Sequence, residues 1–368
     1  MTLVIGIFWS VDSVLRDFPQ ALTKASSFLV QICGIVSWIG AAQFLTIELT
    51  DQYQPFDFSF MNDFAGGQVW YSAAGQESKR INSIMPEPAL LGMLLSFSLG
   101  LILIRLGLLG KTLARELEKI VPTWAACGIL AALLMCGSSL AYAEVIVIFL
   151  VVFFLGFRGI KPRLLVKYAL AAAIGLAIIV TVAERPIESR LQPLLDQDLA
   201  AILENATLSS LAANVFVMAN NLQSNLLLGS GIGAHMIVYN NIIDADFFSG
   251  NTFLADLQLN ADTAASLLIR LLSETGIVGT CAYLALLAVI VVPAFKNIRR
   301  ALAGASNEAR LEQAILAGLL ASAVGTIVHC LLRLGNYYFP PLWMLLAVIN
   351  CSDRLLASCL STPLRPST

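Results

Sequence analysis

Long apolar runs alternate with short polar segments along almost the whole chain. A helix needs about 20 apolar residues to cross the hydrocarbon core of a bilayer, so runs of this length predict membrane spans. The predicted spans are 27–48, 88–109, 122–140, 145–157, 164–183, 275–295, 314–334 and 339–351. This pattern predicts an all-α fold, a polytopic transmembrane helical bundle with about eight spans, in which residues 1–368 form a single integral membrane domain.

Two long connections interrupt the spans, a first outer loop at 49–86 and a large outer loop at 184–274. In the second loop, apolar residues at helical spacing predict an amphipathic helix that lies on the membrane or against the bundle. These residues are Leu208, Leu211, Val215, Met218 and Leu222. The glycine-rich segment 228–233 follows and permits a tight turn or a close approach of backbone to a ligand. A further segment, 137–144, predicts a tight hairpin at one membrane face.

Composition agrees with a membrane protein. Hydrophobic residues make up 58% of the chain and charged residues 12%, and the mean hydropathy is +0.81. An ordinary soluble domain has about 25% charged residues, so a soluble fold is excluded. Nothing supports nucleic acid as a partner. The seven cysteines include no CxxC pair, which indicates packing residues rather than disulfides or metal ligands.

The basic residues predict the orientation. All but six of the 22 lysines and arginines fall on one side of the predicted spans, and this side is cytoplasmic by the positive-inside rule. Both termini are then cytoplasmic, and the two long connections lie outside. The six exceptions on the outer face are Lys79, Arg80, Arg185, Arg190, Arg270 and Arg333.

Aromatic and acidic residues are mixed in the first outer loop and suit carbohydrate, since aromatic faces stack on sugar rings and carboxylates accept hydroxyl hydrogens. Asp63, Trp70 and Tyr71 are the candidates there, together with Tyr337 beside Arg333. The alternative is an aromatic belt at the membrane interface.

Clustered outer arginines are suited to a diphosphate, because guanidinium groups grip phosphate oxygens bidentately. Arg80, Arg190, Arg270 and Arg333 are the candidate diphosphate-binding residues. For Arg333 the alternative is snorkelling to lipid headgroups. For Arg270 it is an intrahelical ion pair with the residue four positions later.

Three residues are candidates for a catalytic base. Glu274 stands four residues after Arg270, where a plain ion pair is the alternative. Glu87 lies at the start of a predicted helix, where the helix dipole alone favours a carboxylate. His235 follows the glycine turn and is either a base near neutral pH or a loop residue.

Five motifs occur in a fixed order, at 85–92 (containing EPALLG), 136–139, 225–233, 271–279 (containing ETGIVG) and 332–338. In this order they resemble the O-antigen polymerase and ligase superfamily (Wzy-type). The resemblance implies a GT-C-like glycosyltransferase that needs no metal and no cofactor. It also implies that the chain acts on undecaprenyl-diphosphate-linked oligosaccharides at the periplasmic face of the bacterial inner membrane. Further partners would be membrane lipid, a chain-length regulator and a flippase.

The function we expect is that of an O-antigen or surface polysaccharide polymerase, in which the arginines hold the diphosphate and Glu274, Glu87 or His235 activates the acceptor hydroxyl. A second hypothesis is an O-antigen ligase that transfers glycan to lipid A core or protein. Ligases of the superfamily usually carry a histidine and an asparagine where this chain has 263–266, so their absence favours the polymerase. The remaining hypotheses are a lipid-linked sugar flippase or transporter and a purely structural membrane subunit.

Overall fold

The computed structural model of the chain describes residues 2–18, 20–50, 83, 85, 88–108, 111–156, 206–243, 264–304, 310–333, 339–352 and 355. Every regular element within these ranges is a helix and none is a strand, which confirms the all-α prediction. The chain divides into two compact units. The first comprises 1–186, 290–326 and 340–368, and the second comprises 187–289 and 327–339.

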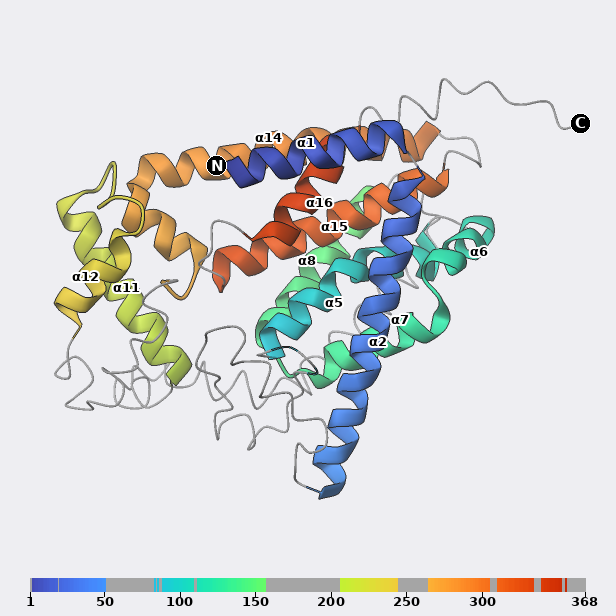
Figure 1. Cartoon of the computed structure of the whole chain (residues 1–368), viewed down its shortest axis with the longest axis horizontal. Coiled ribbons are helices and arrows are strands. Elements are labelled where there is room, and N and C mark those ends of the chain that lie inside the picture. The colour runs from blue at the N-terminus through green and yellow to red at the C-terminus, as the bar shows by residue number, and fades with distance from the viewer. Residues whose placement is uncertain are drawn as a thin grey trace, which may run out of the picture. The chain divides into compact units, whose positions relative to one another are not determined.

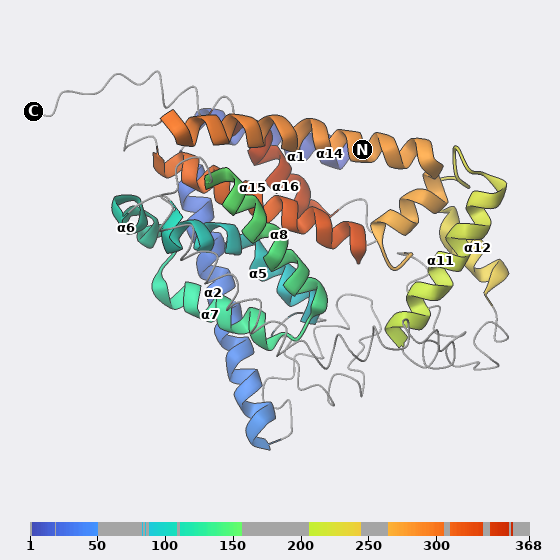
Figure 2. The same ribbon diagram turned by 180° about the vertical axis from the view of Figure 1, so that it is seen from behind.

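Figures 1 and 2 label the helices of the described residues. The first unit contains α1 (Thr2–Asp17), α2 (Ala21–Thr50), α5 (Pro88–Leu103), the π-helix η1 (Ile104–Leu108), α6 (Lys111–Ile120), α7 (Thr123–Met135), α8 (Ser139–Gly156) and α16 (Pro340–Asn350). The second unit contains α11 (Ala206–Ser224) and α12 (Ala234–Ile242). Each unit also receives part of α14 (Leu267–Gly304) and of α15 (Arg310–Leu332).

Four helical segments in the described part of the chain are long and apolar enough to cross a membrane. They are Ala21–Thr50, Ala89–Leu106, Leu267–Leu302 and Leu311–Leu332. Each overlaps a predicted span, although Leu267–Leu302 extends beyond the predicted 275–295 at both ends and begins inside the predicted outer loop. The helices α7, α8 and α16 are apolar but shorter, and the predicted span 164–183 lies outside the described residues. The chain is therefore a protein with several membrane-length helices, and the total of eight spans stays a prediction.

The turn between α7 and α8 is shorter than the hairpin predicted over 137–144. Helix α8 already begins at Ser139, because the hydroxyl of Ser138 accepts a hydrogen bond from the Ala141 N–H at 3.4 Å and caps the helix. Glu144 consequently lies inside an apolar helix rather than in a turn. Its side chain is fully buried, and the hydroxyl of Ser96 on α5 donates a hydrogen bond to its Oε2.

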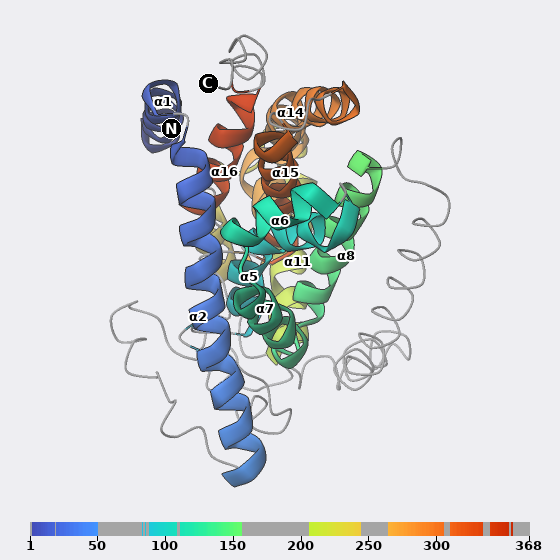
Figure 3. The same ribbon diagram turned by 90° about the vertical axis from the view of Figure 1, so that its right-hand side faces the viewer.

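Small residues hold the helices of the first unit together. A Cβ atom on Gly34 of α2 would lie 2.6 Å from the Cβ of Ala125 on α7, and one on Gly92 of α5 would lie 2.4 Å from the Cβ of Ala141 on α8. Such close backbone approaches are typical of membrane helix pairs, where packing replaces the hydrophobic effect as the driving force. Figure 3 shows α2 running beside α7, as the first of these contacts requires.

In the second unit, α11 confirms the predicted helix, and the face that packs inward carries serine and asparagine side chains next to the predicted apolar face. The buried positions at helical spacing are Ser210, Ala213, Asn214, Val217 and Asn221. Of the predicted apolar face, Leu208 is buried, whereas Leu211 and Val215 are exposed. The apolar face is thus mostly not the packed one, and the serine and asparagine side chains lie inward because they find hydrogen-bond partners inside the unit.

Candidate functional site

The glycine-rich turn after α11 and the first part of α14 are joined backbone to backbone. The N–H groups of Ser230 and Gly231 donate to the carbonyls of Ser273 and Glu274, at 3.1 and 2.8 Å. In return, the N–H groups of Ile277 and Val278 donate to carbonyls of Leu226 and Leu227, both at 3.1 Å.

This exchange is possible because α14 is broken inside its length. Gly276 has φ 62° and ψ −163°, a conformation that is essentially restricted to glycine. The break exposes the carbonyls that end one helical segment and the N–H groups that begin the next. A helix end leaves these groups without intrahelical partners, so the glycine turn caps both segments.

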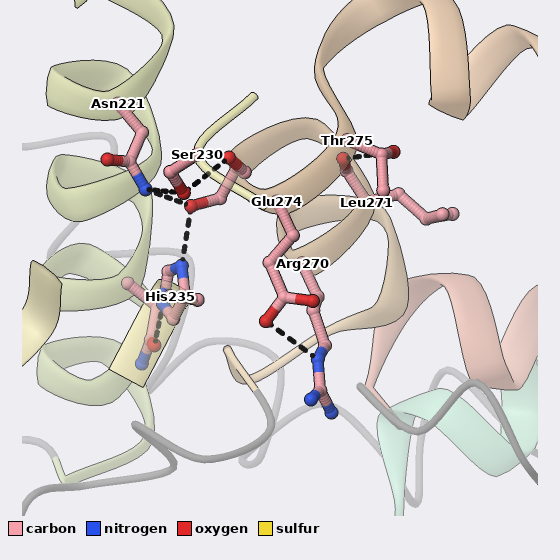
Figure 4. A network of polar contacts seen from close by, with 9 residues as sticks. Asn221, Ser230, His235, Arg270, Leu271, Glu274 and Thr275 are labelled. Carbon is pink, nitrogen blue, oxygen red and sulfur yellow. Dashed lines mark hydrogen bonds and ion pairs between the residues drawn. The ribbon is translucent and has the colours of Figure 1, made fainter. Parts of the chain in front are cut away.

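A buried polar network lies beside this junction and draws on α11, the turn, α12 and α14 (Figure 4). The His235 Nδ1 lies 2.8 Å from the Ser273 hydroxyl, and its Nε2 lies 2.9 Å from the Asn214 Oδ1. The Asn221 amide donates to the hydroxyls of Ser273 and Ser230. The network thus ties three helices of the second unit to one another.

The hydrogen bonds fix the tautomer of His235. The Asn214 amide nitrogen donates to the Ser210 carbonyl, so the Asn214 Oδ1 faces the ring and accepts from the His235 Nε2–H. The Nδ1 is then the acceptor, and the Ser273 hydroxyl donates to it. Burial lowers the pKa of His235 from 6.5 to about 4. Glu274 acts on this pKa in the opposite direction, and Arg270 lowers it further, so the ring is neutral at physiological pH.

Arg270 and Glu274 form an ion pair on one face of α14, with the Arg270 Nε 3.2 Å from the Glu274 Oε1. The two side chains differ in their exposed fraction. The Glu274 side chain is 1% exposed and the Arg270 side chain 19%. Figure 4 shows the Nη groups of Arg270 pointing away from the carboxylate. The N-terminus of the helix that carries the pair is capped, because the Ser266 hydroxyl accepts a hydrogen bond from the Ile269 N–H at 3.1 Å.

Comparisons with protein-family models, with curated proteins and with solved structures found no match. The resemblance to the O-antigen polymerase and ligase superfamily therefore depends on the order of the motifs in the sequence.

Three of the candidate residues lie close together, namely Glu274, Arg270 and His235, since both charged groups act on the pKa of the histidine. Arg333 follows the end of α15, where it is half-buried and its N–H donates to the His329 carbonyl at 2.8 Å. The remaining candidates lie outside the described residues, so their roles stay predictions. They are Glu87, Arg80, Arg190, Asp63, Trp70, Tyr71 and Tyr337.

Sequence reasoning missed the partners of His235. Asn214 and Asn221 stand seven residues apart on α11, a spacing that places both on one face, and this was the available signal. Ser273 directly precedes Glu274, but nothing local links it to a histidine in a different helix. Glu144 was also missed, because it was assigned to a turn rather than to the interior of α8.

Proposed function

We propose that the chain is a polysaccharide polymerase that joins undecaprenyl-diphosphate-linked oligosaccharide repeats at the periplasmic face of the bacterial inner membrane. The observation that supports this most is the direct backbone contact between the glycine turn and the ETGIVG segment. These are two of the motifs on which the superfamily resemblance depends. Their contact brings an arginine, a carboxylate and a histidine together where a membrane-length helix begins.

The reaction would transfer the growing glycan from its lipid carrier to the acceptor sugar of an incoming repeat. The acceptor hydroxyl oxygen bonds to the anomeric carbon, while the bond from that carbon to the diphosphate oxygen breaks. Undecaprenyl diphosphate leaves with the electron pair, and a general base takes the hydroxyl proton. Negative charge therefore builds on the diphosphate as the bond breaks, and a nearby guanidinium stabilises it.

Arg270 is assigned to the diphosphate and Glu274 to the proton. Through its Nε, Arg270 holds the carboxylate, and its Nη groups extend away from it. One helix face thus carries both an anion-binding group and a proton acceptor. Because Glu274 is buried and Arg270 is more exposed, the acceptor hydroxyl of the substrate would approach the Glu274 carboxylate from the side on which Arg270 lies.

His235 is assigned to positioning rather than to proton transfer. Both of its ring nitrogens are held by protein groups, Nδ1 by Ser273 and Nε2 by Asn214. Its Nδ1 already accepts the Ser273 proton, so a substrate hydroxyl would have to displace that serine. Ser273 directly precedes Glu274, so the histidine fixes the helix segment from which the carboxylate projects.

The test is polymer formation by the purified full-length chain in liposomes that contain a synthetic undecaprenyl-diphosphate-linked repeat. We expect a ladder of glycans with wild-type protein and single repeats only with Arg270→Ala or Glu274→Gln. Arg16→Ala is the matched control, because Arg16 forms an exposed i,i+4 ion pair with Asp12 on α1 at 2.8 Å. An unchanged ladder in both site variants, at equal protein level, would refute the assignment. Supplying lipid A core as the acceptor separates a polymerase from a ligase.

One observation favours a second candidate function, a transporter or flippase for lipid-linked sugars. Glu144 is a fully buried carboxylate within an apolar helix and accepts a hydrogen bond from Ser96 on a membrane-length helix. Ionisable groups in such positions often mark proton or substrate pathways. Polymer made from lipid-linked repeats without an ion gradient would exclude transport as the primary activity.

A further inference from the structure

A group of exposed apolar side chains covers the glycine turn and the start of α12, and we name it the leucine turn. Its members are Leu226, Leu227, Leu228, Ile232, Met236 and Ile237. Leu228 is 73% exposed and Ile232 is 79% exposed, although this part of the chain lies in the predicted outer loop. Contiguous apolar surface of this kind indicates an interaction with a protein or a membrane.

Charge is absent from the sequence around the leucine turn. No Asp, Glu, Lys or Arg occurs from residue 206 to residue 243. The polar side chains that do occur there include Asn214, Asn221 and His235, and all three are buried in the network described above. The exposed polar side chains that the structure describes in the segment are all uncharged and flank the leucine turn on both sides, namely Gln223, Ser224, Asn225, Asn240 and Asn241. The turn between them therefore presents mainly apolar side chains outward.

The backbone of the turn is also supplied with hydrogen bonds. Carbonyl groups of Leu226 and Leu227 accept from α14, and the N–H groups of Gly229, Ser230 and Gly231 all donate to carbonyls. Irregular backbone enters hydrocarbon only where its polar groups are satisfied by protein, since each unsatisfied group costs several kcal/mol. The junction with α14 meets this condition at these five positions.

The leucine turn adjoins the exposed apolar surface of a membrane-length helix. The N–H groups that bond to it belong to Ile277 and Val278, whose side chains are exposed and which lie within the candidate span Leu267–Leu302. Farther along the same span, Val289 is 70% exposed. An apolar surface that continues from a span onto a charge-free turn fits the acyl chains of the surrounding bilayer.

We infer that the leucine turn inserts into the acyl-chain region of the lipid bilayer and anchors the second unit there. Insertion of the turn sets how deep the polar network lies in the membrane. The reason is that the N–H groups of Ser230 and Gly231 in this turn donate hydrogen bonds to the carbonyls of Ser273 and Glu274 on α14. The inference does not depend on the polymerase activity. It concerns only which surface of the chain contacts lipid.

The test places the photocrosslinker p-benzoylphenylalanine at single positions of the full-length chain in phosphatidylglycerol and phosphatidylethanolamine nanodiscs. Position Leu228 probes the leucine turn, Val289 is the control expected to contact lipid, and Asn240, an exposed polar residue of α12, is the control expected to contact water. After irradiation, mass spectrometry of the digested protein should find lipid adducts at 228 as abundantly as at 289, and none at 240.

Two outcomes would overturn the inference: a lack of lipid adducts at 228 while 289 forms them, or adducts at 228 to another part of the chain or to a second copy. A second measurement guards against misfolding of the labelled protein. Leu228→Asp should lower the melting temperature in nanodiscs more than Asn240→Asp does, because only the first places a carboxylate in hydrocarbon. Equal melting temperatures for the two variants would contradict insertion.

Discussion

Gly229 and Gly276 meet backbone to backbone. A Cβ atom on Gly276 would lie 2.6 Å from the Gly229 nitrogen, and one on Gly229 would lie 2.4 Å from the carbonyl carbon of Glu274. Both glycines have positive φ values, 68° for Gly229 and 62° for Gly276. A side chain at either position would separate the segment that leads to His235 from the segment that carries Glu274.

Gly276→Ala is expected to lower the free energy of unfolding by about 3 kcal/mol. Its backbone conformation is essentially closed to residues with a Cβ, and the added atom would also lie 2.5 Å from the Leu227 carbonyl oxygen. Thermal unfolding of the detergent-solubilised protein measures the loss.

The matched control is Gly231→Ala. Gly231 also has positive φ, 104°, but no heavy atom lies within 4 Å of its Cβ position. The control therefore carries backbone strain without crowding, and we expect a loss of about 1 kcal/mol. If Gly276→Ala costs no more than Gly231→Ala, the close contact between the two segments is absent in solution.

His235 should make stability depend on pH. Its pKa falls from 6.5 to about 4 on folding because burial disfavours the charged ring. Between these values the unfolded chain binds the proton more readily, so its contribution to stability is complete above pH 6.5 and declines as the pH falls towards 4. The full decline is about 3 kcal/mol. Unfolding measured across this pH range tests it.

His235→Gln is the comparison for this pH profile, because an amide does not titrate. The variant should be less stable at neutral pH, since it cannot reproduce both ring hydrogen bonds to Ser273 and Asn214. The difference in stability between wild type and variant should then shrink as the pH falls. A constant difference from pH 7 to pH 4 would mean that the ring does not stay neutral in the folded protein.

Membrane-length helices were predictable from the sequence because a long apolar run is a local property. Segments 27–48 and 314–334 lie within α2 and α15, apart from the two residues after Leu332 in the second case. The start of α8 was not predictable in this way, since one hydrogen bond from Ala141 to the Ser138 hydroxyl decides it.

The sequence did not decide which face of α11 packs inward, since its apolar face was predicted to lie either on the membrane or against the bundle. Helical spacing shows which residues share a face, and the usual rule then turns the apolar face inward. That rule assumes water outside, whereas in a membrane protein hydrogen-bonding side chains can face the interior. At the candidate functional site, too, the sequence predicted only the contact between neighbouring residues of one helix. The i,i+4 spacing of Arg270 and Glu274 indicated their ion pair, but the contact of His235 with Ser273 depends on the Gly276 break.

Tyr239→Phe is expected to raise the free energy of unfolding by about 1 kcal/mol. The hydroxyl of Tyr239 on α12 is buried and has no hydrogen-bond partner among the described residues. Tyr142→Phe is the opposite case, because the Tyr142 hydroxyl donates to the Leu134 carbonyl at 2.8 Å, and this variant should lose about 1 kcal/mol. The same atom is removed in both variants, so melting temperatures that shift in one direction would contradict the assigned hydrogen bonding.

Ser96→Ala is expected to lower the free energy of unfolding by about 2 kcal/mol. It removes a hydroxyl that lies within hydrogen-bond reach of both the Glu144 Oε2 and the Met93 carbonyl of its own helix, the latter at 2.8 Å, and so leaves a buried carboxyl group with one hydrogen bond fewer. Ser37→Ala is the control, since the Ser37 hydroxyl is equally buried but donates only to the Cys33 carbonyl of its own helix at 2.6 Å. Thermal unfolding should therefore show a clearly larger loss for Ser96→Ala. Equal losses would mean that Glu144 draws its stabilisation from elsewhere, and Ser96 would then have no special part in holding a carboxylate between α5 and α8.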